Sequence, residues 1–560
     1  MSNIKYLFGV YNKNFEMPLP KKGFKATAYT ALAIIAVTCI VIPCCLIVGF
    51  ITDILSEAMM MAGSKTAALM SEIHIMSVFS LVFGLFVIFS VLFFSSDREH
   101  MVTLPITPTE LLAAKFRHTY IAESIMEFLV LLSMFIGYFI ACVKNYGSFS
   151  SFGPVSVLMA LIATFVTPLL PLVYCAIISM LLMALLKNVR NAKLFFHVSD
   201  FFLLLFIALF LLSFKDSGGV TVTNYIDSLL ADNNLFFRIC NILFFTVPIL
   251  GKAMEAESII YSLLYLAANI IPVALMLLIG KYLYLEGLHT AASLGSTHKQ
   301  ANVDKLNIKL TSPLSACFKK EFRVLLRTKA YSNNCVYINL LWPVGVILFF
   351  VLSRKNENVI RFIELYKDPS YPRAALITML AVIAISFIAS ALNTLASTAF
   401  SREGAHVDLI KYIPVPYSTQ LYAKVLTALV FTYPALLLSI IAAQHFLGFG
   451  ILTGLVYALT AFLAMTICIV TGLSMDSAAP FTVWSDEYSA LRGNLNSFFN
   501  MAVSMLVAFL LCALIFLLYE LTTASLATVT ILVLVILGIA ATFAVSFGRR
   551  IIINNMKELY

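Results

Sequence analysis

Charged side chains that could pair with one another or with a partner protein occur in two matching passages of this sequence. Each passage holds an Arg-Glu pair, two prolines and a lysine: Arg98, Glu99, Pro105, Pro108 and Lys115 in the first, and Arg402, Glu403, Pro414, Pro416 and Lys424 in the second. The first proline and the lysine are ten residues apart in both (115 − 105 and 424 − 414), and the copies lie 414 − 105 = 309 positions apart. We interpret the passages as an internal repeat; the alternative is chance similarity between two membrane loops.

Catalytic and metal-binding patterns are missing from the sequence. Gly251-Lys252 and Gly280-Lys281 lack the upstream glycine of a phosphate-binding loop. None of the eight histidines has His-Glu-x-x-His spacing, and no Cys-x-x-Cys occurs among the ten cysteines. We therefore predict that the chain is not an enzyme, has no metal site and binds no cofactor of its own.

Few charged residues interrupt the apolar runs, which argues against an ion-driven carrier or a proton pump. Glu127 lies about ten residues into the third run, one turn after Glu123, and is expected either near the cytoplasmic interface or facing a water-filled crevice. Asn269 and Asn393 either line a pathway or bond to a neighbouring helix. These three residues are the candidates for the pathway.

The composition indicates an all-α polytopic membrane protein. The chain has 560 residues, of which 61% are hydrophobic and 12% are charged, and soluble domains have about 25% charged residues. Runs of about 20 apolar residues predict about 12 transmembrane helices, at 27–51, 74–95, 118–142, 154–186, 194–213, 257–285, 332–353, 374–400, 421–445, 447–471, 497–518 and 523–547. Pro168 and Pro171 predict a kink within 154–186.

The distribution of basic residues predicts the orientation. If the amino terminus is cytoplasmic, 27 of the 37 Lys and Arg residues face the cytoplasm, as the positive-inside rule requires. Both termini and both repeated passages then lie on that side. This bias also explains the net charge of +9 without nucleic acid, so we predict no nucleic-acid partner.

Six spans separate the repeated passages, so the two halves share one orientation and form two parallel six-helix repeats. The predicted domains are residues 1–285, the first half; 286–331, a cytoplasmic linker and amphipathic helix; and 332–560, the second half. Within the linker, Leu314, Phe318 and Phe322 share one face of a helix in 313–331, as expected of a helix in the membrane interface. Residues 236–250 are apolar but too short to span, which predicts a re-entrant helix, a cap or a surface helix.

A third passage completes a resemblance to a known family. It contains Asp476, Pro480, Trp484, Glu487, Arg492 and Asn494. Together with the two repeated passages, it resembles the membrane-spanning permeases of bacterial type 2 ATP-binding cassette (ABC) exporters, in the fused form with two six-span halves. Arg492-Gly493 stands where that family usually has Lys-Gln.

The resemblance implies a permease subunit in the bacterial plasma membrane that forms the substrate pathway. A separate cytoplasmic ABC ATPase, expected to act as a dimer, would use ATP and Mg and push on the two repeated passages. The residues of the third passage would form a cytoplasmic loop characteristic of the family. The substrate is a small molecule, a peptide or a lipid.

Residues Arg98, Glu99, Arg402 and Glu403 either contact that ATPase or brace their own loops, and bracing is favoured because exposed single ion pairs contribute only about 0–1 kcal/mol. Two other classes of protein remain open. An ATP-independent secondary transporter with parallel repeats would need charges inside its spans. An integral membrane enzyme would need paired polar catalytic groups there.

Overall fold

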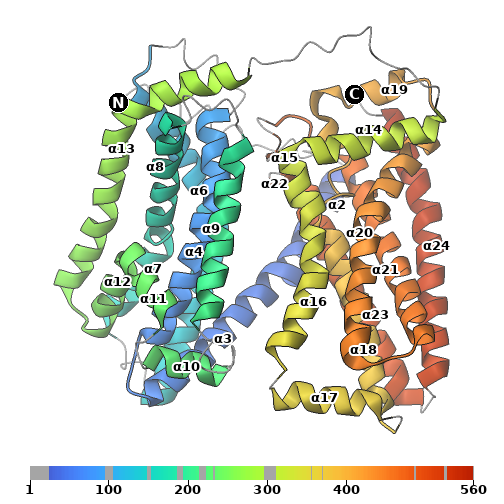
Figure 1. Ribbon diagram of the computed structural model, residues 1–560, viewed down its shortest axis with the longest axis horizontal. Helices are drawn as coiled ribbons and strands as arrows, with labels where there is room; N and C mark the ends of the chain where they lie inside the picture. Colours follow the sequence, from blue (N-terminus) through green and yellow to red (C-terminus); the bar gives the residue numbers. More distant parts are fainter. Residues whose placement is uncertain are drawn as a thin grey trace. The chain divides into compact units, whose positions relative to one another are not determined.

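Every regular element in the described part of the chain is a helix (Figure 1). The computed structural model describes the residues 24–94, 105–147, 153–185, 193–213, 222–230, 234–295, 311–354, 356–368, 370–484, 487, 489–492, 494–522 and 526–558. The protein is therefore an all-helical, multi-pass membrane protein, as its composition predicts.

The described helices belong to two compact units. The described part of unit 1 begins at Ile42 and contains the helices α3 to α13. Unit 2 contains every described helix from α14 onward, together with α2 (Phe24–Ala36) and the π-helical segment η1 (Val37–Val41). The amino-terminal helix α2 thus belongs with the carboxy-terminal part of the chain. Its partner there is α23 (Leu495–Thr522), where Ala36 and Ile40 pack against Phe499 and Ala502.

Unit 1 consists of long helices and several shorter ones. In chain order they are α3 (Ile42–Met61), α4 (Ala67–Phe89), η2 (Ser90–Phe94), α6 (Pro108–Tyr146), α7 (Pro154–Val166), α8 (Leu169–Leu185), α9 (Lys193–Leu212), α10 (Val222–Leu230), α11 (Leu235–Leu243), α12 (Thr246–Glu255) and α13 (Ile259–Gly295). Thr107 and Glu110 form a capping box at the start of α6, and Gly147 ends that helix in the left-handed conformation.

Unit 2 places two amphipathic helices crosswise to its long helices. These are α14 (Pro313–Arg327) at one end and α17 (Glu357–Lys367) at the other (Figure 1). The other elements are α15 (Lys329–Tyr331), η6 (Ser332–Val336), η7 (Tyr337–Leu340), α16 (Leu341–Leu352), α18 (Pro372–Leu392), η8 (Ser401–His406), α19 (Leu409–Tyr412), α20 (Tyr417–Leu447), α21 (Ile451–Ala478), α22 (Ser489–Arg492) and α24 (Leu526–Glu558).

Eleven described helices are long and apolar enough to cross a membrane, or 12 if the bent pair α11–α12 is one span. They agree with the predicted spans in most of the chain. The predicted kink is present, because Thr167 and Pro168 separate α7 from α8 within one candidate span. The predicted span 194–213 coincides with α9, which is not among the 11.

The first span is shifted from its predicted position. The sequence predicts 27–51, whereas the candidate span is Ile42–Met61. The predicted span stops two residues before Asp53, and a carboxylate is costly in hydrocarbon. In the structure that carboxylate is buried and paired with Lys144 of α6, so the helix continues past it.

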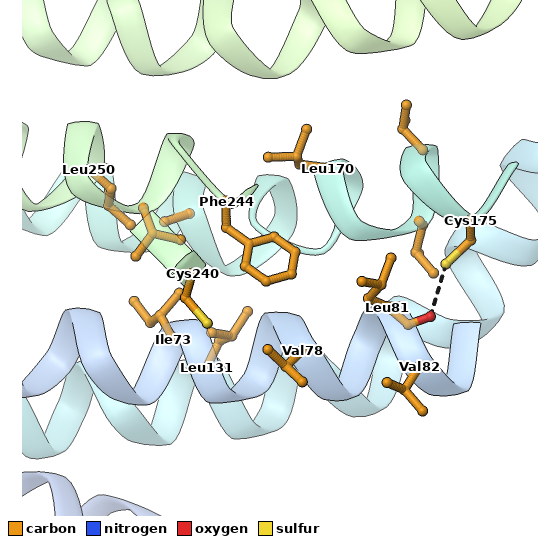
Figure 2. Packing of buried hydrophobic residues seen from close by; sticks show 14 of the residues in the cluster. Ile73, Val78, Leu81, Val82, Leu131, Leu170, Cys175, Cys240, Phe244 and Leu250 are labelled. Atoms are coloured by element: carbon orange, nitrogen blue, oxygen red, sulfur yellow. Dashed lines mark hydrogen bonds between the residues drawn. The ribbon is translucent and has the colours of Figure 1, made fainter. Parts of the chain in front are cut away.

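The core of unit 1 contains the segment predicted as re-entrant, cap or surface helix. Helices α11 and α12 meet at an angle of 93°. Cys240, Phe244 and Leu250 from this pair lie against Ile73 and Val78 of α4 (Figure 2). The segment is therefore packed into the unit on one face, and its opposite face exposes Ile242.

The long helices pack in a similar order in the two units. In unit 1, α3 packs on α6, α4 on α8, and α8 on α13. In unit 2, α16 packs on α20, α18 on α21, and α21 on α24. Because α6 and α20 each follow one of the matching sequence passages, the two series of pairs run in the same chain order.

Candidate functional site

The second repeated passage forms a buried ionic cluster in unit 2. Lys424 lies near the start of α20, and its side chain is only 3% exposed. Its ammonium donates to Glu321 Oε1 of α14 at 2.7 Å, to Glu403 Oε1 of η8 at 2.9 Å and to the Ala399 carbonyl at 2.8 Å. The three donors of a lysine are thus all used, and one side chain joins three segments of the unit.

Lys320 extends this cluster toward the surface. Its ammonium contacts both carboxylate oxygens of Glu403, at 2.5 and 2.7 Å, and lies 3.8 Å from Glu321. Burial opposes the charged form of Glu403, but the ammonium groups of Lys424 and Lys320 outweigh that effect and hold its pKa well below the usual range. We call Lys320, Glu321, Glu403 and Lys424 the ionic cluster.

The side chain of Arg402, the residue before Glu403, contacts other groups of unit 2. Its guanidinium donates to the Leu395 carbonyl at 3.0 Å and to Thr398 Oγ1 at 2.5 Å. It also lies 5.9 Å from the ring centre of Tyr331, a cation–π distance. In the second passage both charged residues of the Arg-Glu pair therefore bond within their own unit, as the bracing alternative expects.

Asp476, from the third passage, fixes the start of η8. Its buried carboxylate accepts hydrogen bonds from the backbone N–H of Phe400 at 2.6 Å and of Ser401 at 3.1 Å, and from the Ser401 hydroxyl. Asn496 donates to the same carboxylate at 3.3 Å and to the Ala479 carbonyl at 2.8 Å. A charged acceptor at the first turn of a helix satisfies N–H groups that have no partner within the helix.

Trp484 connects the loop of the third passage to the same turn by a hydrogen bond. Its indole N–H donates to the Ser401 carbonyl at 3.0 Å, and the Phe481 N–H donates to the Ser401 hydroxyl at 2.8 Å. Gly404 has φ +59°, and a Cβ there would lie 2.7 Å from Trp484 Cζ2. Glycine is therefore required at this position for both its backbone conformation and its size.

The rest of the third passage lies around this turn. Asn494 is buried and accepts from the Asn496 N–H at 3.0 Å, and Pro480 is half-buried. Glu487 is exposed. The backbone of Arg492 ends α22, which packs on η8. The Asp476 network, defined as Ser401, Asp476, Trp484 and Asn496, thus holds the second and third passages together.

The first repeated passage is only partly described. Arg98 and Glu99 lie outside the described residues. Pro105 precedes the capped start of α6, and Pro108 is the first residue of that helix. Lys115 is fully buried and is the eighth residue of α6, as Lys424 is of α20 (115 − 108 = 424 − 417 = 7). In the second passage, Pro414 and Pro416 likewise come directly before the helix.

The three pathway candidates are buried in different helices. Asn393, at the end of α18, donates to Asn339 Oδ1 at 3.1 Å and to Thr432 Oγ1 at 2.7 Å. This is the alternative in which it bonds to neighbouring helices. Asn269 donates to the Tyr265 carbonyl of its own helix α13 at 2.9 Å. Glu127 is buried in the middle of α6.

Sequence reasoning missed several residues of the site. Glu321 was assigned no role, yet it pairs with Lys424. Ser401 and Asn496 are common residue types with no spacing pattern, so no sequence signal identifies them as partners of Asp476. The expectation of few charges in the spans is also wrong in part, because Asp53 and Glu72 are buried within candidate spans of unit 1.

The site has the chemistry of a rigid joint, because its oppositely charged groups neutralise one another. Within the described ranges no three His, Cys, Asp or Glu residues are grouped to hold a metal ion. No protein-family model, curated protein or solved structure matches the chain.

Proposed function

We propose that this protein is the membrane-spanning permease subunit of an ATP-binding cassette exporter, and that a separate cytoplasmic ATPase drives it. The observation that carries the proposal is the joint in unit 2. A proline-preceded helix, α20, begins at an exposed loop, and its buried Lys424 ties that loop to α14 and η8. A displacement of the loop would therefore move three helical elements together.

The loop offers a surface on which a partner could push. Tyr412, at the end of α19, is 77% exposed, and Leu409 and Ile413 are also exposed. Large apolar side chains gathered on a polar loop are typical of protein–protein contact sites. The ATPase would bind ATP and Mg, because this chain has no phosphate-binding loop of its own.

The comparison of the two units supports a permease made of two related halves. Lys115 and Lys424 occupy the same position in α6 and α20, and the long helices of each unit pack in the same chain order. Parallel halves of this kind move against each other in alternating-access transporters. We place both termini and both loops on the cytoplasmic side of a bacterial plasma membrane. The substrate would be a small molecule, peptide or lipid.

A second candidate function is an ATP-independent secondary transporter. The observation in its favour is the pair of buried carboxyl groups, Asp53 and Glu72, inside candidate spans. Ion-driven carriers require such groups. The two functions differ in whether transport needs a partner ATPase.

A pull-down of the tagged, full-length protein in mild detergent tests the proposal, with the bound proteins identified and their ATPase activity assayed. We expect an ABC ATPase to co-purify with the wild type. The variant Tyr412→Ala should lose it. The control Ile242→Ala removes a side chain of similar exposure, 80%, from α11 and should retain it. Transport in proteoliposomes without ATP and without a partner ATPase would contradict the exporter proposal and favour the secondary transporter.

A further inference from the structure

A buried carboxyl group in unit 1 has no part in the ionic cluster or the proposed coupling. Glu72, in the first turns of α4, is only 8% exposed. Its Oε2 lies 2.5 Å from the hydroxyl oxygen of Thr52 on α3. Its other oxygen, Oε1, is buried and has no hydrogen-bond partner. A buried ionised carboxylate normally accepts several hydrogen bonds or faces a cation.

The hydrogens around Thr52 do not suffice for an ionised Glu72. The Thr52 hydroxyl has one hydrogen but two close acceptor oxygens, Glu72 Oε2 at 2.5 Å and the Val48 carbonyl at 3.0 Å. If that hydrogen goes to Val48, the short contact needs a proton on Glu72. If it goes to Glu72, an ionised carboxylate would have one donor and one bare, buried oxygen.

The lysine that contacts α3 is paired with other carboxylates. Lys144 of α6 pairs with Asp53, the residue after Thr52, and lies 3.7 Å from Glu57. Within the described ranges, Glu72 takes part in no ion pair. The neighbouring Ser71 bonds to the Tyr225 hydroxyl at 2.8 Å, so that phenol is also engaged.

Titratable side chains also lie on α4 and on the elements that pack against it. They are Cys44, Cys45, Asp53 and Glu57 on α3, His74 on α4 itself, Glu110, Lys115, Arg117, His118, Tyr120, Glu123, Glu127, Tyr138, Cys142, Lys144 and Tyr146 on α6, Tyr174 and Cys175 on α8, Tyr225 and Asp227 on α10, Arg238 and Cys240 on α11, and Lys252 and Glu255 on α12. His74 bonds the Met70 carbonyl through Nδ1 at 2.6 Å. The side chains of His197 and Asp200 on α9 lie outside the described part.

We propose that Glu72 carries a proton in this conformation and is a proton-binding site inside unit 1. The neutral carboxyl donates its proton to Thr52 Oγ1, and the Thr52 hydroxyl then donates to the Val48 carbonyl, so every hydrogen has one acceptor. When the proton leaves to the aqueous phase, a negative charge remains between α3 and α4 with no cation beside it. Loss of the proton therefore disfavours this packing of the two helices, whichever energy source drives transport.

Infrared spectroscopy of the full-length protein in lipid nanodiscs tests the proposal. The spectrum of Glu72→Gln is subtracted from that of the wild type at neutral pH, in H₂O and in D₂O. The subtraction is needed because Asp53 and Glu127 are also buried carboxyl groups of the unit. We expect a C=O band of a protonated carboxyl that shifts in D₂O. The control Glu57→Gln, at a half-buried carboxyl that lies 3.7 Å from the Lys144 ammonium, should remove no such band.

The variant Thr52→Val serves if Glu72→Gln does not fold. It keeps the carboxyl but removes its acceptor, so the C=O band should move to higher frequency. A subtraction that shows only carboxylate bands at neutral pH would overturn the proposal, as would a band that Thr52→Val leaves unchanged. Neither result depends on whether an ATPase binds, so this test and that of the exporter proposal fail separately.

Discussion

Replacing Lys424 with methionine should reveal how much the ionic cluster stabilises unit 2. Methionine fills similar space but removes the ammonium, so Glu321 and Glu403 lose donors at 2.7 and 2.9 Å. Removing one partner of a buried ion pair costs about 3–5 kcal/mol. We expect about 3 kcal/mol, the lower end of that range, because Lys320 still contacts Glu403.

The free energy of unfolding can be measured by titrating detergent-solubilised protein with sodium dodecyl sulfate. Tryptophan fluorescence is the signal, because the chain has only two tryptophans and Trp484 is bonded to Ser401 beside the cluster. Lys320→Met is the matched control. Its side chain is 45% exposed, so the loss should be only about 0–1 kcal/mol.

A double variant shows whether the unpaired charge causes the loss. In Lys424→Met with Glu321→Gln, one of the two carboxylates left without its donor is neutral, so part of the stability should return. Equal unfolding free energies for Lys424→Met and Lys320→Met would refute the reasoning. They would mean that the buried Lys424 contributes no more to the free energy of unfolding than the more exposed Lys320.

Three further predictions concern the same turn. Lys424 and Lys320 hold the pKa of Glu403 below the usual range. The ionised Glu403 therefore stabilises the fold above the ordinary carboxyl pKa of about 4.3, and this stabilisation is lost as the pH falls below that value. Denaturant titrations between pH 6 and pH 3 should show a larger loss of unfolding free energy for the wild type than for Glu403→Gln. Gly404→Ala should cost about 1–3 kcal/mol and change Trp484 fluorescence, whereas Gly448→Ala, at φ +74° without a clash below 3.6 Å, should cost less and leave that fluorescence unchanged. Asp476→Asn should cost about 1.5–3 kcal/mol, the range for hydrogen bonds to a charged group, and expose Trp484 to an aqueous quencher; unchanged quenching would contradict the assigned hydrogen bonds.

The sequence alone predicts much of the helical architecture, because span length and hydropathy are properties of local stretches. It fails where a distant side chain changes the local energetics. Residues 52–61 lie beyond the predicted span 27–51, yet they belong to α3, where Asp53 pairs with Lys144, 91 positions away.

The candidate site, too, is predicted from the sequence only where its pattern is local. The spacing of the prolines and the lysine identifies the helix start that carries Lys424, because that pattern is local. Its partner Glu321 lies 103 positions away on α14. There its position among Lys319, Lys320 and Arg323 is typical of a solvated helix face. Packing of α14 on α20 buries the carboxylate, and no local pattern reports that packing.

Because α2 belongs to unit 2, the amino-terminal part of the chain contributes a helix to the carboxy-terminal unit. A cut between α13 and α14 would yield an amino-terminal fragment that still carries one helix of the other unit. That helix would remain docked on α23 through Ala36 and Ile40, in the manner of an exchanged element between subunits. Two separately expressed halves would therefore hold each other as a swapped pair, and a half that lacks residues 24–41 would leave Phe499 and Ala502 of α23 uncovered on its partner.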